Sequence, residues 1–246
     1  SFIDGQLPIV VNALNRKDTI GILPTGSGKS LCYQFCCLLQ PAISFIVAPI
    51  LSLIYDQKEN LDEFGIDRTN YITSDQDGSK KEEIINEFGN GKYLMIWISP
   101  ERFQTTKFRE QLNQININRN FSYAVIDEVH CLSEWGHDFR TSYLNLVRTI
   151  RTYCPQTILI GLTATASQFV LEDLKIEFQI GSESIKSVSS MSRKELTFHI
   201  KIVDDRFKYE SLLLKLREIN NYYKKQAFTI KGDDTACGLI FTVNRG

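Results

Sequence analysis

The sequence predicts an α/β protein with a mostly parallel sheet covered by helices on both faces. Several short segments are apolar throughout, which is typical of strands that are buried on both faces of a sheet. The stretches between them carry apolar residues at a spacing of three to four, which is typical of helices. Strands and helices that alternate in this way along a chain favour a parallel sheet between two layers of helices.

The predicted elements follow one another along most of the chain. With 246 residues, 43% of them apolar, the chain is long enough to bury one large core, or one core and part of another. We expect strands over residues 19–23, 43–48, 93–98, 121–126 and 157–162. We expect helices over residues 31–40, 51–64, 80–88 and 143–152.

The character of the sequence changes after about Gly181. Residues 182–203 alternate in polarity like exposed strands, and residues 205–223 have the pattern of one helix. Residues 224–238 are polar enough for a loop, and residues 238–246, GLIFTVNRG, have the pattern of a new apolar strand. A strand that follows a helix here indicates the start of a second α/β unit.

We therefore predict two parts. Residues 1–190 form the first domain, and residues 191–246 form an interdomain segment followed by the truncated start of a second, similar domain.

Composition excludes some classes of protein but not others. The formal net charge is −1, which neither suggests nor excludes a nucleic-acid partner. The six cysteines lie mostly in apolar runs without a CxxC pair, which favours reduced, buried thiols over disulfides or a zinc site. The sequence shows no charged-then-apolar leader and no run of ~18 apolar residues, so we expect no membrane contact. We expect residues 1–246 by themselves to be a monomer. We expect a cytoplasmic location, associated with the nucleoid if the source is bacterial.

A glycine-rich segment, PTGSGKS at residues 24–30, joins the first expected strand to a helix. Its glycines let consecutive backbone N–H groups point at phosphate oxygens, and the start of the helix near Lys29 adds a positive end. Lys29 would reach the β- and γ-phosphates of ATP, and the Ser30 hydroxyl would ligate Mg²⁺. A glycine turn that merely caps a helix is the alternative. The predicted nucleotide-binding residues of this P-loop are Thr25, Gly26, Ser27, Gly28, Lys29 and Ser30.

Two adjacent carboxylates, Asp127 and Glu128, end the strand expected over residues 121–126. Ligands collect at the carboxyl ends of strands in open α/β sheets. Asp127 would hold Mg²⁺, and Glu128 would orient and deprotonate the attacking water. Such pairs also occur at ordinary strand ends, but together with the P-loop they predict a catalytic set of Lys29, Asp127 and Glu128.

Six further segments carry recognisable patterns: APILSLIYDQ at 48–57, WISPERF at 97–103, DEVH at 127–130, CLSEWGHDFR at 131–140, LTATA at 162–166 and GLIFTVNR at 238–245. The first three and LTATA resemble motifs of superfamily 2 helicases, in the order of that family. CLSEWGHDFR resembles the aromatic-rich loop of RecQ-type DNA helicases, and GLIFTVNR resembles the first motif of their second motor domain. The resemblance implies a RecA-like P-loop domain of an ATP-driven motor that unwinds DNA from 3′ to 5′.

The resemblance also implies an adenine contact and a missing catalytic arginine. FIDGQ at residues 2–6 resembles the adenine-recognition motif, which places Gln6 on the adenine edge by two hydrogen bonds. In this family a second motor domain supplies an arginine to the transition state. We therefore expect residues 1–246 alone to bind Mg²⁺-ATP but to hydrolyse it slowly and to bind single-stranded DNA weakly.

The segment after the carboxylates is rich in groups that can stack on bases. Trp135, His137, Phe139 and Arg140 lie within six residues, and aromatic and guanidinium planes stack on unpaired bases. Such a loop beside the γ-phosphate could report bound DNA to the hydrolysis site. A buried Trp–Phe cluster at the edge of the sheet is the alternative.

Other candidates have two interpretations each. His130 would hydrogen-bond Thr163 or Thr165 and so link the carboxylates to the next strand, or it is an ordinary core histidine. Ser52 would cap its helix or contact a DNA phosphate. Arg102 would pair with Glu101 at the surface or, as the resemblance implies, lie near DNA.

The predicted partner is DNA, either single-stranded or with a 3′ single-stranded tail. A small-molecule kinase would share the P-loop, but it should carry an arginine-rich lid and lack the aromatic-rich loop. A nucleotide-gated DNA-binding module without unwinding activity would share every motif.

Overall fold

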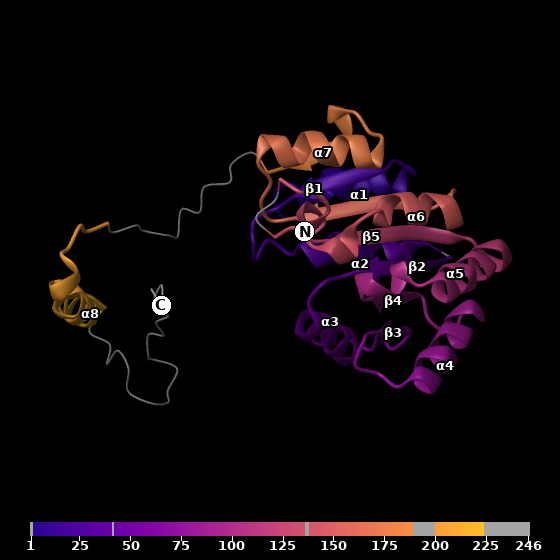
Figure 1. The fold of residues 1–246 in the computed structure, drawn as a ribbon, viewed down its shortest axis with the longest axis horizontal. Helices are drawn as coiled ribbons and strands as arrows, with labels where there is room; N and C mark the ends of the chain where they lie inside the picture. The colour runs from indigo at the N-terminus through magenta and orange to yellow at the C-terminus, as the bar shows by residue number, and fades with distance from the viewer. Residues whose placement is uncertain (1, 41, 136–137, 189–199, 224–246) are drawn as a thin grey trace. The chain divides into compact units, whose positions relative to one another are not determined.

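The computed structural model describes residues 2–40, 42–135, 138–188 and 200–223 (Figure 1). The chain divides into two compact units, residues 1–192 and 193–246. In the second unit the described residues form a 3₁₀ turn at Asp205–Phe207 and helix α8, Lys208–Tyr223. The expected loop and strand after residue 223 lie outside the described residues, so the start of a second motor domain stays a prediction.

A seven-stranded sheet forms the centre of the first unit, and all of its described strand pairs are parallel. The order of the strands is β3-β4-β2-β5-β6-β1-β7. This confirms the predicted α/β fold with a parallel sheet. The strands are β1 Thr19–Ile22, β2 Ile43–Val47, β3 Thr69–Ile72, β4 Met95–Ile98, β5 Phe121–Asp127, β6 Ile158–Thr163 and β7 Ile185–Ser187.

The two strands that the sequence did not predict individually lie at the two edges of the sheet. β3 has the sequence TNYI with two half-buried residues, and β7 has only three residues, none of them fully buried. An edge strand has one neighbour and a partly exposed surface, so it lacks the continuous apolar run of a central strand. The residues expected to continue the exposed strands after β7, 189–199, lie outside the described residues.

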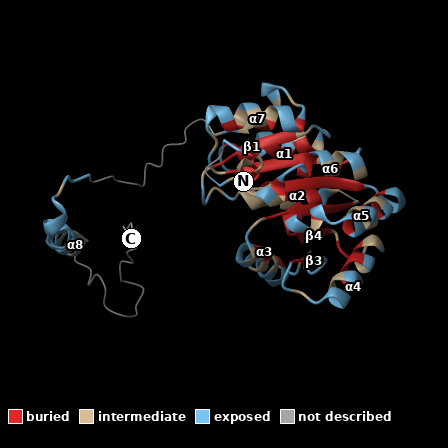
Figure 2. Cartoon of the chain, viewed as in Figure 1, coloured by how far each residue is buried: buried red, intermediate tan, exposed pale blue. Residues whose placement is uncertain are grey.

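The helices form two layers, one on each face of the sheet (Figures 1 and 2). One hydrophobic cluster packs α1, α2 and α3 against the sheet, and a second packs α4, α5, α6 and α7 against the other face. Figure 2 shows buried strands between helices whose outer faces are exposed. The helices are α1 Gln6–Leu14, α2 Lys29–Leu39, α3 Leu51–Glu63, α4 Gly78–Gly89, α5 Thr106–Arg119, α6 Leu146–Tyr153 and α7 Gln168–Phe178.

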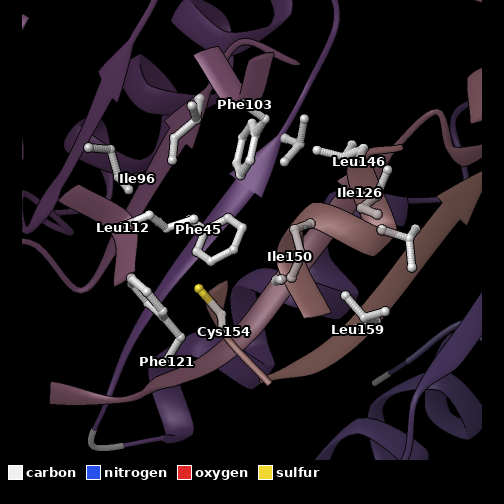
Figure 3. Packing of buried hydrophobic residues seen from close by; sticks show 14 of the residues in the cluster. Phe45, Ile96, Phe103, Leu112, Phe121, Ile126, Leu146, Ile150, Cys154 and Leu159 are labelled. Carbon is white, nitrogen blue, oxygen red and sulfur yellow. The ribbon is translucent and has the colours of Figure 1, made fainter. Parts of the chain in front are cut away.

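Alternate residues of each central strand point to opposite clusters. Phe45 and Val47 of β2 lie in the cluster of α4–α7, whereas Ile46 lies in the cluster of α1–α3. Figure 3 shows Phe45 surrounded by side chains of neighbouring strands and helices, among them Leu112 of α5 and Ile150 of α6. This two-sided burial is the reason that the central strands are apolar throughout.

Three helices were not among the expected ones, α1, α5 and α7. α5 is mostly polar, and only Phe108, Leu112, Ile115 and Asn116 are buried on its inner face. Those positions are spaced by four, three and one, so the helical pattern is present but sparse. α6 begins at Leu146 rather than at residue 143, because Thr141–Tyr143 form a separate 3₁₀ turn.

The cysteines that the structure describes are free and buried, as the sequence favoured. Burial raises the pKa of the Cys36, Cys37 and Cys154 thiols to about 12. Cys237 lies outside the described residues. Within the described part of the chain, the helices are too short or too polar to cross a membrane.

Candidate functional site

The candidate site forms where three neighbouring strands end. β6 lies between β5 and β1, with Ile22 of β1 opposite Thr163 and Asp127 of β5 opposite Leu162. The backbone N–H of Leu23 donates to the Thr163 carbonyl at 3.0 Å and extends this pairing into the loop after β1. The parallel topology therefore brings the P-loop, the carboxylate pair and residues 163–165, the TAT segment, to one edge of the sheet.

The P-loop adopts a shape that needs glycine at two positions. Gly26 has φ +81° and Gly28 has φ +65°, both in the left-handed region. A Cβ at Gly28 would also lie 2.8 Å from the Gln6 amide nitrogen, whereas nothing lies within 4 Å of a Cβ at Gly26. Ser27 closes the turn, because its N–H and its hydroxyl donate to the Pro24 carbonyl at 3.1 and 2.5 Å. The outer side of the loop is thus open to a phosphate group.

The predicted P-loop residues lie together at the start of α2. Gly28 is the N-cap residue, and Lys29 and Ser30 are the first two residues of the helix. Thr25 and Gly26 are exposed, while Ser27, Lys29 and Ser30 are half-buried. Backbone N–H groups at an open helix start, next to a lysine, fit the phosphates of a nucleotide. The Ser30 hydroxyl and the Asp127 carboxylate are the hard oxygen donors that Mg²⁺ prefers.

Gln6 lies beneath the P-loop, and its amide is already engaged. Its Nε2 donates to the carbonyls of Ser27 at 2.9 Å and Gly28 at 3.2 Å, and its Oε1 accepts from the Ile3 N–H at 3.0 Å. The side chain is buried. Donation from Nε2 to an adenine edge would therefore require Gln6 to give up one of these bonds, whereas Oε1 has a second lone pair, and the adenine role stays a prediction.

The carboxylate pair is arranged by an unusual backbone conformation. Glu128 has φ +50°, and its N–H donates to Asp127 Oδ1 at 3.0 Å. The Tyr143 hydroxyl donates to the Asp127 carbonyl at 3.1 Å and fixes the end of β5. A left-handed backbone conformation at a residue other than glycine lowers the stability of the fold. Such strained residues are concentrated at functional sites.

The two carboxyl groups have opposite pKa shifts. Burial and the neighbouring Glu128 charge raise the pKa of Asp127 to about 6, although Lys29 acts against this shift. A hydrogen bond from His130 lowers the pKa of Glu128. At neutral pH the site therefore holds two adjacent carboxylates that are both mainly ionised, and the charges of Lys29 and His130 offset them in part.

We expect Asp127→Asn to stabilise the chain in the absence of Mg²⁺ at pH 7.5. The folded-state pKa of about 6 lies above the unfolded value of 3.8, so the ionised carboxylate destabilises the fold above pH 6. This cost shrinks as the pH falls from 6 towards 3.8, because the folded state takes up the proton first. Urea unfolding should show a gain of about 1–3 kcal/mol at pH 7.5 and much less at pH 4. An equal gain at both pH values would show that the buried charge of Asp127 is not the cause.

His130 joins the carboxylates to the end of β6. Its Nδ1 lies 2.8 Å from Thr163 Oγ1 and 3.3 Å from Glu128 Oε2. The Thr163 hydroxyl donates its hydrogen to the Thr165 carbonyl at 2.9 Å, so toward His130 it acts as an acceptor and Nδ1–H donates. The expected contact of His130 with Thr163 is present. Thr165 takes part only indirectly, because its backbone carbonyl accepts the hydrogen bond from the Thr163 hydroxyl.

The aromatic-rich loop starts directly after this histidine. The Arg140 N–H donates to the Cys131 carbonyl at 3.3 Å, so the loop folds back on its own start. Arg140 also donates to the Pro49 carbonyl at 3.3 Å and to Asp138 Oδ2 at 3.1 Å. Phe139 is half-buried, and His137 lies outside the described residues.

Trp135 is not part of a buried cluster. The side chain is 73% exposed, and its ring lies 6.5 Å from the ring of Phe169 in α7, which is 75% exposed. The Ser133 hydroxyl accepts from the Trp135 N–H at 3.2 Å and donates to Asp173 at 2.6 Å, which ties the loop to α7. The alternative of a buried Trp–Phe cluster is therefore wrong for Trp135.

A cavity of about 310 Å³ separates Trp135 from the TAT segment. It connects the exposed loop with the histidine that bonds Glu128. The lining residues are His130, Trp135, Asp138, Thr165, Ala166, Ser167 and Val170.

Ser52 and Arg102 lie on other elements, Ser52 in α3 and Arg102 in the 3₁₀ turn Pro100–Gln104. α3 begins at Leu51 with Ile50 as its N-cap, so Ser52 is not the capping residue and its side chain is exposed. The Arg102 guanidinium lies 5.4 Å from the centroid of the Phe108 ring, and its buried Nε has no hydrogen-bond partner among the described residues. A contact of either residue with DNA stays a prediction.

Sequence reasoning missed Phe169, Tyr143 and Asp138 as members of the site. Phe169 follows the LTATA segment by three positions, but nothing in the sequence shows that its ring is exposed beside Trp135. Asp138 lies inside the aromatic-rich segment, and a carboxylate between His137 and Phe139 was the feature of the sequence that could have identified it as a member of the site.

The chain is similar in sequence to known helicases. The DEAD/DEAH box helicase family model matches residues 4–174. The ATP-dependent DNA helicase RecQ of Bacillus subtilis (strain 168) is 36% identical over 197 residues, which is 80% of this chain and 32% of that protein. The RecQ-like DNA helicase blm-1 of Caenorhabditis elegans is 30% identical over 247 residues, 98% of this chain and 23% of that protein. The chain spans about a third or less of the length of these two relatives.

Solved structures share the fold. The DUF1998 helicase MrfA bound to DNA and AMPPNP has a TM-score of 0.64 at 18% identity, over 91% of this chain and 32% of that chain. The Pyrococcus furiosus Hef helicase domain has a TM-score of 0.53 at 16% identity, over 89% of this chain and 46% of that chain. At such identities the likeness concerns the fold, which is that of helicase motor domains.

Proposed function

Since this chain belongs to the DEAD/DEAH box helicase family and its relatives include RecQ DNA helicases, we propose that it is the ATP-binding first motor domain of a RecQ-type DNA helicase. The observation that carries the proposal is the meeting of the P-loop and the Asp127–Glu128 pair at the ends of neighbouring parallel strands. A backbone cradle with two adjacent carboxylates beside it supports phosphoryl transfer to water.

Each residue at this edge has a task in the proposed reaction. Backbone N–H groups around Gly26 and Gly28 bind the phosphates, and Lys29 offsets their negative charge. Ser30 and Asp127 would hold Mg²⁺, which supplies charge neutralisation at the transferred phosphoryl group when it is bound. Glu128 orients the attacking water and accepts its proton, for which its lowered pKa keeps it ionised.

DNA is the proposed partner, single-stranded or with a 3′ single-stranded tail. The support is an exposed Trp135 ring, connected through a cavity to His130, which bonds both Glu128 and Thr163. A base that stacks on Trp135 can shift the loop, and the loop starts at the residue after His130. Bound DNA would in this way change the position of Glu128.

We expect Trp135→Ala to separate DNA binding from hydrolysis. ATP turnover of the full-length protein should be measured with and without single-stranded DNA. The variant should keep the rate measured without DNA and lose most of the stimulation, because a stacking contact worth ~1–3 kcal/mol per base is removed. Phe64→Ala is the matched control, since Phe64 is an aromatic side chain that is 82% exposed at the end of α3. Loss of both rates in Trp135→Ala would mean that the loop is only structural.

A further inference from the structure

Three potential metal ligands meet where the aromatic-rich loop starts. One ligand atom each of His130, Cys131 and Asp138 lies within 4.8 Å of the other two. Cys131 Sγ is 3.9 Å from His130 Nε2 and 3.8 Å from Asp138 Oδ2. Zinc bonds of ~2.3 Å to sulfur and ~2.0 Å to nitrogen or oxygen place tetrahedral ligand atoms about 3.5 Å apart. The cluster is therefore within a few tenths of an ångström of a zinc geometry at both sulfur contacts.

The imidazole of His130 already has the orientation of a metal ligand. Its Nδ1–H donates to Thr163 Oγ1 and lies 3.3 Å from Glu128 Oε2, whereas Nε2 faces the Cys131 sulfur. Histidines that bind metals commonly donate their other ring N–H to a carboxylate or another oxygen, which fixes the tautomer and the direction of the lone pair. Glu128 and Thr163 supply that support here.

The donor set distinguishes this cluster from the proposed Mg²⁺ site. Sulfur, imidazole nitrogen and one carboxylate oxygen suit zinc and similar borderline-soft ions, whereas Ser30 and Asp127 offer only oxygen. Three protein ligands leave a fourth position for water.

An ion can reach the cluster from the cavity beside Trp135. His130 and Asp138 line that cavity, whereas Cys131 is buried behind them. Asp138 is paired with Arg140 at 3.1 Å, but its carboxylate has a second oxygen and the pair is partly exposed, so this contact opposes binding only weakly.

We propose that His130, Cys131 and Asp138 form a binding site for Zn²⁺ that fixes the start of the aromatic-rich loop. Entry of the ion releases two protons to solvent, one from the Cys131 thiol and one from Nε2 of His130, whose pKa the hydrogen bonds with Cys131 and Glu128 raise to about 10. The ion then joins two ends of the loop, residues 131 and 138, to the histidine that bonds Glu128. Zn²⁺ should consequently reduce stimulation of hydrolysis by DNA; this consequence rests on the proposed function, but binding of the ion does not.

The test uses Co²⁺ as a spectroscopic substitute for Zn²⁺ on the 246-residue chain, with Mg²⁺ in excess and without nucleotide or DNA. A Cys237→Ser background leaves only the cysteines that the structure describes. We expect a thiolate-to-cobalt charge-transfer band that one equivalent of Zn²⁺ removes. Cys131→Ser should abolish the band, and Glu128→Gln should weaken Zn²⁺ binding by about 10- to 100-fold, because it removes the negative charge beside His130 Nδ1 that makes the imidazole a stronger ligand.

Two further variants keep the result interpretable. Cys154→Ser removes a buried cysteine in the cluster of α4–α7 and should leave the band unchanged. Asp138→Asn changes an exposed side chain without endangering the core, and it should weaken Zn²⁺ binding by at least about tenfold. A band that survives Cys131→Ser, or Zn²⁺ binding unaffected by Asp138→Asn, would overturn the site whatever the protein does with ATP and DNA.

Discussion

Replacing Glu128 by glutamine is expected to lower the rate of ATP hydrolysis by about 10²- to 10⁴-fold while leaving ATP binding nearly unchanged. Glutamine has the shape of glutamate and can still accept the hydrogen bond from His130 Nδ1, but it cannot take the proton of the attacking water. Glu128 lies at the end of β5, outside the P-loop that holds the phosphates. The chemical step and the binding step therefore depend on different residues.

Single-turnover hydrolysis by the full-length protein and equilibrium binding of a fluorescent ATP analogue measure the two steps separately. Glu128→Asp is the informative companion, because it retains the carboxylate but shortens its reach, and it should recover part of the rate. A large loss of ATP affinity in Glu128→Gln would show that Glu128 holds the nucleotide rather than the water, and the proposed division of roles would fail.

The parts of the site that the sequence predicted are those formed by local sequence. The P-loop and the carboxylate pair each follow a central strand, and such strands are recognisable because they are buried on both faces. Parallel topology then requires their carboxyl ends to lie at the same edge. Both the fold class and the meeting of Lys29 with Asp127 and Glu128 follow from these two facts.

The parts that the sequence did not predict depend on contacts between distant segments. The amide of Gln6 donates to carbonyls more than twenty positions away along the chain. No local sequence pattern indicates that Gln6 binds these carbonyls rather than an adenine. Phe169 beside Trp135 and Asp138 beside Cys131 arise because α7 and a returning loop meet at the end of β5. The periodicity of apolar residues indicates which side chains face the core, but it does not predict which exposed rings or polar side chains meet at a loop.

The loss of folding stability caused by the ionised Asp127 carboxylate and the proposed affinity for Mg²⁺ have the same physical origin. A carboxylate with its pKa raised to about 6 is ionised at neutral pH at a cost in folding free energy. A bound cation would offset the negative charge, so the folding free energy that the ionised carboxylate costs would be recovered when the cation binds. This is the expected relation between stability and function at a preformed cation site.

Replacing Lys29 by alanine is expected to weaken ATP binding by at least about 30-fold, which corresponds to the 2 kcal/mol or more that is lost when one partner of a hydrogen-bonded charge pair is truncated. The Lys29 charge lowers the pKa of both Asp127 and Glu128, so its ammonium group acts on the same region that the γ-phosphate would enter. Without it, the phosphates would meet two carboxylates with less positive charge beside them.

Isothermal titration with a non-hydrolysable ATP analogue and Mg²⁺ measures this effect directly on the 246-residue chain. Lys17→Ala is the matched control, since Lys17 is an exposed lysine that precedes the same strand β1 at its opposite end, and it should bind ATP normally. Lys29→Ala should also raise the pKa of Asp127 further, because the charge that opposes the shift is gone. Normal affinity in Lys29→Ala would mean that the backbone N–H groups of the P-loop hold the phosphates by themselves, and that Lys29 acts only on the carboxylates.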